Sequence, residues 1–148
     1  MATAVSQTNP TRDSDPLDRL RDELARPPYH AFLRPHAERA DPESGTVVIA
    51  LPFRPEFRRA PDGPGYHGGI IAALIDLAAH AAVAVKIGRM APTIDLRIDY
   101  LRVASDTDLR ATAKLLRAGR SIGLADVEVT DGDGRMIAVG RGTFSTRE

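Results

Sequence analysis

The chain has no cysteine and no tryptophan, and four phenylalanines and three tyrosines are its only aromatic residues. Without cysteine it can form no disulfide and no thiolate nucleophile, which fits the reducing cytoplasm, the location that we expect. Neither sign of charge is in excess, because 20 basic residues balance 20 acidic ones. A protein without surplus positive charge has little to neutralise a phosphate backbone, so we expect no nucleic-acid partner.

The N-terminal region lacks an apolar stretch of the kind that a signal peptide contains. Residues 1–15 are polar and aperiodic, so we expect a disordered segment there. The remaining length, 16–148, is suited to a single domain.

One long apolar run is present, HGGIIAALIDLAAHAAVAVKI, from His67 to Ile87. Its composition predicts a helix over about 68–87 that is buried on nearly every side. Asp76 and His80 lie near its middle, which favours a core helix of a soluble protein over a membrane span. A carboxylate inside such a helix is costly unless it is paired or used, so Asp76 needs an explanation.

The other segments predict an antiparallel sheet. Residues 131–134, Asp-Gly-Asp-Gly, are a strong hairpin signal, and a change of apolar phase near Gly123 suggests a bulge there. Consecutive hairpins indicate an α+β fold in which the sheet wraps the long helix. Besides that helix we expect a short N-terminal helix over 16–26, an irregular apolar segment from Pro28, a Pro- and Gly-rich loop over 54–66, and strands over 45–53, 93–103, 109–117, 122–130 and 135–144.

Four sequence segments together resemble the hotdog-fold acyl-CoA thioesterases: HGGIIAALIDLA, TIDLRIDYLR, a Gly-Arg-Ser step and DGDGRMIAVGRGTF. The resemblance covers 29–146 and is strongest to the PaaI-like and 4-hydroxybenzoyl-CoA thioesterase branches. Its most specific feature is HGG with an acidic residue nine positions after the histidine, here His67 and Asp76. It implies a hotdog fold, a homodimer that pairs its sheets side by side, and often a homotetramer built as a dimer of dimers.

The resemblance also implies an activity, the hydrolysis of an acyl-CoA to a carboxylic acid and CoA. The Gly68 N–H would polarise the thioester carbonyl from the helix N-terminus, and Asp76 would act as general base or nucleophile. A structural alternative stays open for each: the glycines could simply make a tight helix entry, and Asp76 could be a hydrogen-bond hub. Eight residues correspond to about 12 Å along a helix, so the two groups cannot reach one carbonyl from the same helix. If both act, the site combines two subunits.

Two positions depart from the resembling family. His80 stands where relatives more often carry Ser or Thr, and it could tune Asp76, hold a water or be a core histidine. Pro61 stands where relatives commonly carry Gln or Asn. His67 could anchor the loop or contact the thioester. These departures keep open an alternative function, a non-catalytic acyl-CoA-binding protein of the hotdog fold.

We expect no metal, because the histidines are not at metal-ligand spacing, and no cofactor beyond the CoA of the substrate. By resemblance, basic residues near one strand link would bind CoA. The candidate substrate-contacting residues are Gly69, Arg117, Arg120 and Ser121, together with Ala73, Leu77 and Val83 for the acyl group.

Overall fold

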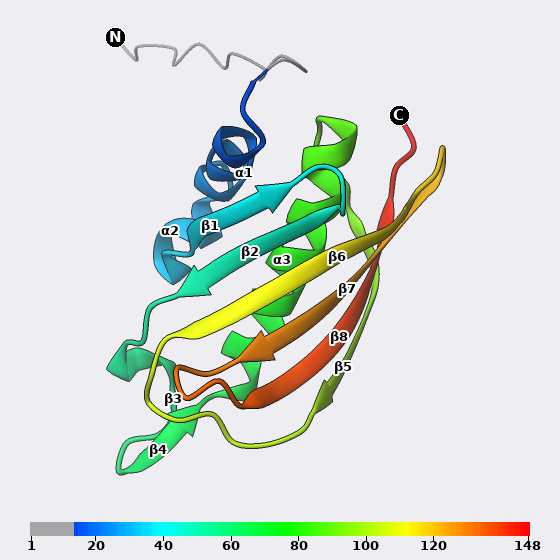
Figure 1. The fold of residues 1–148 in the computed structure, drawn as a ribbon. Helices are drawn as coiled ribbons and strands as arrows, with labels where there is room; N and C mark the ends of the chain where they lie inside the picture. The colour runs from blue at the N-terminus through cyan, green and yellow to red at the C-terminus, as the bar shows by residue number, and fades with distance from the viewer. Residues whose placement is uncertain (1–13) are drawn as a thin grey trace, which may run out of the picture.

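A computed structural model describes residues 14–148, so the segment expected to be disordered lies outside the described residues except for its last two positions. Two helices open the described part of the chain, and the long helix α3 then separates two groups of strands (Figure 1). The elements are α1 (Pro16–Ala25), α2 (Pro28–Leu33), β1 (His36–Asp41), β2 (Thr46–Leu51), the 3-10 turn η1 (Pro55–Phe57), β3 (Arg58–Ala60), β4 (Gly63–Tyr66), α3 (Gly68–Ile87), β5 (Thr93–Tyr100), β6 (Leu109–Ala118), β7 (Ile122–Thr130) and β8 (Met136–Ser145).

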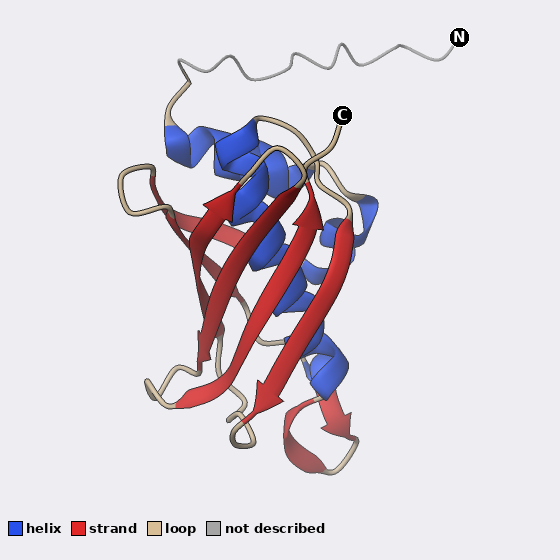
Figure 2. Cartoon of the chain, turned by 90° about the vertical axis from the view of Figure 1, so that its right-hand side faces the viewer, coloured by secondary structure: helices blue, strands red, loops and turns tan. Residues whose placement is uncertain are grey.

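Six strands form one antiparallel sheet in the order β1-β2-β6-β7-β8-β5. The sheet curves around α3, which crosses its concave face (Figures 1 and 2). β3 and β4 pair separately, just before α3 begins. The predicted hotdog arrangement of a sheet wrapped around a central helix is confirmed, and β5 lies at one edge of the sheet.

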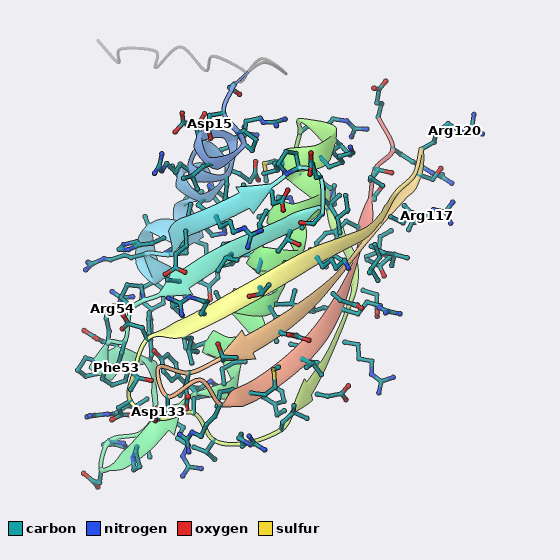
Figure 3. All side chains as sticks on the ribbon, viewed as in Figure 1. Asp15, Phe53, Arg54, Arg117, Arg120 and Asp133 are labelled. Carbon is teal, nitrogen blue, oxygen red and sulfur yellow. The ribbon has the colours of Figure 1, made fainter. Side chains whose placement is uncertain are left out.

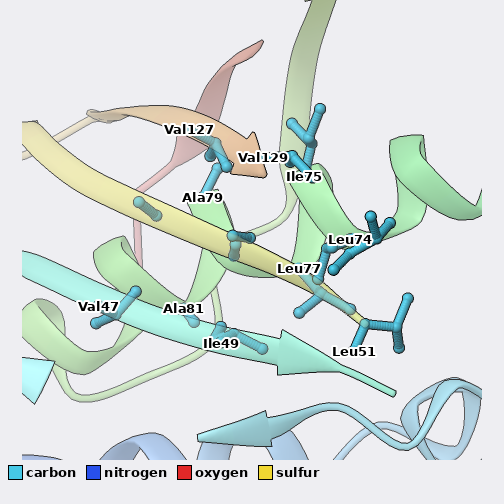
Figure 4. Close-up of a cluster of buried hydrophobic side chains, with 14 of the residues drawn as sticks. Val47, Ile49, Leu51, Leu74, Ile75, Leu77, Ala79, Ala81, Val127 and Val129 are labelled. Carbon is cyan, nitrogen blue, oxygen red and sulfur yellow. The ribbon is translucent and has the colours of Figure 1, made fainter. Parts of the chain in front are cut away.

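Helix α3 occupies the predicted residues, and its C-terminal end lies at the glycine that follows them. Gly88 adopts the left-handed conformation with φ 76°, and its N–H donates to Ala84 O at 2.8 Å, which terminates the helix. By length and composition α3 could cross a membrane, but here it is the buried core helix. Its apolar side chains meet alternate residues of the sheet, such as Val47, Ile49 and Val127 (Figure 4).

Three expectations about the N-terminal half were wrong. The segment after Pro27 is not irregular, because Pro28 begins α2, a position where proline is well suited to a helix. The strand β1 was missed because HAERAD has no apolar alternation, as befits an edge strand with no fully buried residue. The expected loop over 54–66 contains the short strands β3 and β4.

The predicted bulge at Gly123 was also wrong. The inward positions of β7 continue without a slip through Gly123, Ala125 and Val127, and the register shift lies on the paired strand, between Leu115 and Arg117. Small residues are needed here because α3 passes close: a Cβ on Gly123 would lie 2.7 Å from Val83 Cγ1. Val83, which we expected to contact the acyl group, is fully buried in the core.

Candidate active site

A surface cavity of about 380 Å³ lies beside the middle of α3 and contains Asp76. The walls come from α3, from the start of α2 and from the segment that leads into β5. Two of the residues expected to contact the acyl group, Ala73 and Leu77, do line it. The full lining is Pro27, Tyr29, His30, Ala73, Asp76, Leu77, His80, Met90, Ala91, Pro92 and Thr93.

Asp76 is half-buried and opens to this cavity instead of being sealed in the core. The hydroxyl of Thr93, at the start of β5, donates to Asp76 Oδ1 at 3.0 Å. This hydrogen bond orients the carboxyl group and leaves Oδ2 without a hydrogen-bond partner among the described residues. Thr93 was not anticipated, because nothing in its local pattern marks it and only the fold brings it to Asp76.

His80 lines the same cavity, but both ring nitrogens have partners other than Asp76. Its Nε2 accepts the N–H of Ala91 at 3.2 Å, which places the ring proton on Nδ1. Nδ1 faces Oε1 of Glu23 at 3.4 Å, and the ring packs edge-on against Phe144. Burial lowers the pKa of His80, against the opposing effect of the carboxylates of Glu23 and Asp76. The ring is therefore neutral near pH 7 and is held in the core.

Glu23 is a second residue that sequence reasoning missed. Its side chain is only 6% exposed, and besides His80 it approaches Arg26, at 3.8 Å. A signal was available: Glu23 falls between Leu20 and Leu24, both buried on the face of α1 that packs on α3. A carboxylate on an apolar helix face is expected to have a partner inside the protein.

The N-terminus of α3 presents the other predicted group. His67 is the N-cap: its Nδ1 accepts the N–H of Gly69 at 2.9 Å, and its carbonyl accepts the N–H of Ile70 at 3.0 Å. The N–H of Gly68 has no acceptor within residues 14–148. The hydroxyl of Tyr100 donates to Gly68 O at 2.8 Å and ties the helix start to β5. The first turn of α3 thus offers one uncommitted donor at the positive end of the helix dipole.

The two glycines differ in what the fold requires of them. A Cβ on Gly69 would lie 3.0 Å from His67 Nδ1, so glycine there makes room for the histidine cap. A Cβ on Gly68 would lie 3.5 Å from the Tyr100 ring, which is an ordinary contact, and Gly68 does not have a positive φ. The fold of one chain therefore does not require glycine at 68. A glycine at this position permits a ligand to approach the backbone closely.

The structure separates the predicted residues into three groups. Asp76, His80, Ala73 and Leu77 meet in the cavity, whereas His67, Gly68 and Gly69 lie at the helix start and do not line it. The third group lies where β6 passes into β7: Arg117 is near the end of β6, and Arg120 and Ser121 are in the link that follows. Figure 3 shows the two arginines at this tip of the sheet. None of these three lines the Asp76 cavity. Pro61 is exposed in the turn between β3 and β4.

Comparison with known proteins gives concordant results. The family model described as "Thioesterase superfamily" matches residues 66–138. A Halobacterium salinarum protein provisionally named as an esterase is 35% identical over 115 residues, or 70% of this chain and 76% of that protein. The medium/long-chain acyl-CoA thioesterase YigI of Salmonella typhimurium is 36% identical over 94 residues, or 53% of this chain and 60% of that enzyme. A crystal structure described as a thioesterase superfamily protein superposes with a TM-score of 0.84 at 34% identity, covering 90% of this chain and 100% of the other.

Proposed function

The chain belongs to the thioesterase superfamily, and on that premise we propose that it hydrolyses an acyl-CoA thioester to a carboxylic acid and CoA. The observation that carries the proposal is the pair of half-sites on α3. One is the uncommitted N–H of Gly68, and the other is the Asp76 carboxylate, which opens to a cavity and is oriented by Thr93. An anion-stabilising donor and an ionised carboxylate are the two groups that hydrolysis of a thioester needs.

The half-sites must come from two subunits. Both lie on one helix, eight residues or about 12 Å apart, and Gly68 does not line the Asp76 cavity. We therefore propose a homodimer in which the Gly68 N–H of one subunit serves the Asp76 of the other. The edge strand β5 supports this, because its outer edge has no partner strand among the described residues, and Ile94 and Tyr100 are each more than half exposed. A dimer of dimers is the larger assembly that we expect.

In the proposed reaction, Asp76 takes a proton from a water molecule, and the resulting hydroxide attacks the thioester carbonyl carbon. The oxygen of the tetrahedral intermediate accepts the N–H of Gly68 from the other subunit. The intermediate collapses by breaking its C–S bond, and the CoA thiolate leaves and takes up a proton. In the alternative mechanism, the Asp76 carboxylate itself attacks the thioester carbonyl carbon and displaces CoA, which forms an acyl-aspartyl anhydride. Water then hydrolyses the anhydride, and the Gly68 N–H serves as the donor in both steps.

The remaining predicted residues have proposed roles outside the reacting centre. His67 caps α3 and so holds Gly68 in place, and His80 fixes the packing of α3 against α1 beneath the cavity. Ala73 and Leu77 would contact the acyl group. For Gly69, Arg117, Arg120 and Ser121 we propose contacts with CoA, whose phosphates attract guanidinium groups.

The test is a thiol-release assay over saturated acyl-CoAs from short to long chains and over aromatic acyl-CoAs. Asp76→Asn should lower kcat by roughly 10²- to 10⁴-fold, the range for loss of a general base. The matched control is Asp133→Asn, which removes an exposed carboxylate from a distant hairpin and should leave kcat unchanged. Unchanged turnover in Asp76→Asn would remove Asp76 from the mechanism. Retained acyl-CoA binding with no turnover of any substrate would instead favour a non-catalytic binding protein.

A further inference from the structure

A second cavity, of about 420 Å³, lies between α1, the turn that joins β1 to β2, and the C-terminal half of α3. It shares no lining residue with the Asp76 cavity. Eight of its twelve lining residues are apolar residues or glycine, and the three charged side chains come from α1, from the end of β1 and from α3. The lining residues are Pro16, Arg19, Ala40, Asp41, Pro42, Gly45, Thr46, Val47, Ala82, Val85, Lys86 and Leu115.

Arg19 is the unusual feature of this cavity. Its Nε is buried and has no hydrogen-bond acceptor among the described residues. Its Nη1 reaches only the carbonyl of Val85, at 3.5 Å, the outer limit for a hydrogen bond. Nε is sealed from the cavity, but the guanidinium as a whole lines it and forms no ion pair within residues 14–148. An anionic ligand in the cavity would therefore neutralise this charge and accept hydrogen bonds from the Nη groups.

The one carboxylate on the cavity wall is already committed elsewhere. Asp41 accepts hydrogen bonds from the Ser44 hydroxyl, from the backbone N–H groups of Ser44 and Glu43, and from Arg39. These contacts lower the pKa of Asp41, so it stays ionised without neutralising Arg19. An ionised carboxylate here would repel a dianionic phosphate more strongly than a monoanion. Lys86, exposed at the rim, adds a second positive charge.

We propose that this cavity binds a small amphipathic monocarboxylate, an acid with an aliphatic or aromatic body. The carboxylate accepts hydrogen bonds from the Nη groups of Arg19, and the apolar body lies against Val47, Ala82 and Leu115. The volume falls within the range of small-molecule sites in proteins. The acid released by thioester hydrolysis is of this class; that link alone rests on the proposed function, whereas the binding site does not.

The probe is hexanoate, titrated by calorimetry and by amide chemical-shift mapping, with hexan-1-ol as the uncharged analogue. Wild-type protein should bind hexanoate, with shifts at Val47 and Val85, and should bind hexan-1-ol more weakly. Arg19→Gln should weaken hexanoate binding roughly ten- to a hundredfold, the effect of losing charge-assisted hydrogen bonds. Arg21→Gln is the matched control: its guanidinium is on the same helix, pairs with Asp18 at the surface and should not matter.

A second variant guards against misfolding of Arg19→Gln. Lys86→Glu changes an exposed side chain at the rim and should weaken hexanoate binding several-fold, with the loss reduced by added salt. The proposal is overturned if wild type binds no hexanoate, if hexan-1-ol binds as tightly, if Arg19→Gln binds hexanoate as wild type does, or if the shifts fall at Ala73 and Asp76. Each of these results can occur whether or not the protein hydrolyses acyl-CoA, so the site and the proposed function fail separately.

Discussion

At the scale of single residues, Gly68 is a position where stability and activity should change in opposite directions. A Cβ there makes only an ordinary contact with Tyr100, and alanine favours a helix over glycine by about 1 kcal/mol. Gly68→Ala should therefore keep or raise the free energy of unfolding, while kcat/KM falls by roughly 10²-fold because the methyl group obstructs the N–H donor. Urea unfolding and the thiol-release assay on the same preparation measure both quantities. Gly69→Ala gives the contrast, since its Cβ would crowd His67 and weaken the cap. Full activity in Gly68→Ala would exclude this N–H from the mechanism.

The sequence predicted the site residues that lie on one helix, because helical spacing places them on the same face. Ala73, Asp76, Leu77 and His80 share one face of α3, so their meeting follows from one predicted helix. Thr93 and Glu23 reach the same place from β5 and α1, and their contacts depend on how three elements pack. No spacing in the sequence contains that information. It is also why His80, although one turn from Asp76, hydrogen-bonds elsewhere.

At the scale of elements, the strands with one face buried in the core were the ones that the sequence located correctly. Segments with one face on the core, such as β2 and β6, alternate apolar and polar residues and were placed within a few residues. The edge strand β1 has no such alternation, because no buried face selects it, and β3 and β4 are too short to show one. The inward glycine of β7 was misinterpreted for a related reason. Gly123 leaves room for α3, and this requirement comes from the packing of two elements that are distant in the sequence.

The close approach of β7 to α3 at Gly123 predicts the effect of adding a side chain there. Gly123→Ala places a Cβ 2.7 Å from Val83 Cγ1 and 3.2 Å from Thr146 Cγ2, and Val83 is fully buried. Overpacking should lower the free energy of unfolding by about 1–3 kcal/mol, measured by urea denaturation. Gly63→Ala is the control, since its Cβ would meet only Ala60, at 3.8 Å. Adding Val83→Ala should recover part of the loss, and equal stability of Gly123→Ala and wild type would contradict the close packing of β7 on α3.

The hairpin between β7 and β8 is held by Asp131, whose side chain is fully buried. Burial raises the pKa of Asp131, but hydrogen bonds from the side chain and backbone of Arg135 and from Ser105 outweigh it and lower the pKa to about 2. The unfolded value is near 3.8, so the ionised carboxylate stabilises the fold above that pH, and this contribution is lost as the pH falls towards 2.

Asp131→Asn should therefore cost about 1–3 kcal/mol of unfolding free energy at pH 7 and much less near pH 2. Urea denaturation at pH 7, 4 and 2.5 measures the difference from wild type. Asp133→Asn, which removes the exposed neighbouring carboxylate, should show little effect at any of these values. A constant difference between Asp131→Asn and wild type across the pH range would show that the charge of Asp131 is not what holds the turn.

At the scale of the whole molecule, the proposed reaction divides each site between two chains, and the sheet of one chain ends at β5, which has no outer partner strand among the described residues. α3 carries a backbone N–H donor at its start and a carboxylate at its middle, and β5 exposes Ile94 and Tyr100 at an edge that is unpaired within residues 14–148. Joining two chains along β5 would bury those side chains and extend the sheet. A two-fold axis relates identical surfaces, so each donor that serves a partner's carboxylate is matched by the reverse arrangement. Two equivalent sites per dimer follow.

Mixing two inactive variants tests this division directly. One variant loses the carboxylate, Asp76→Asn, and the other loses access to the donor, Gly68→Val. In a mixed dimer the intact Gly68 of the first variant meets the intact Asp76 of the second, while the other site holds both changes. Random re-association makes about half the dimers mixed, so co-unfolded and refolded variants should recover about a quarter of wild-type activity. The control is a mixture in which the variants are refolded separately and assayed at once, before subunits exchange. If donor and carboxylate act from the same chain, every site in every dimer keeps at least one substitution and no activity returns.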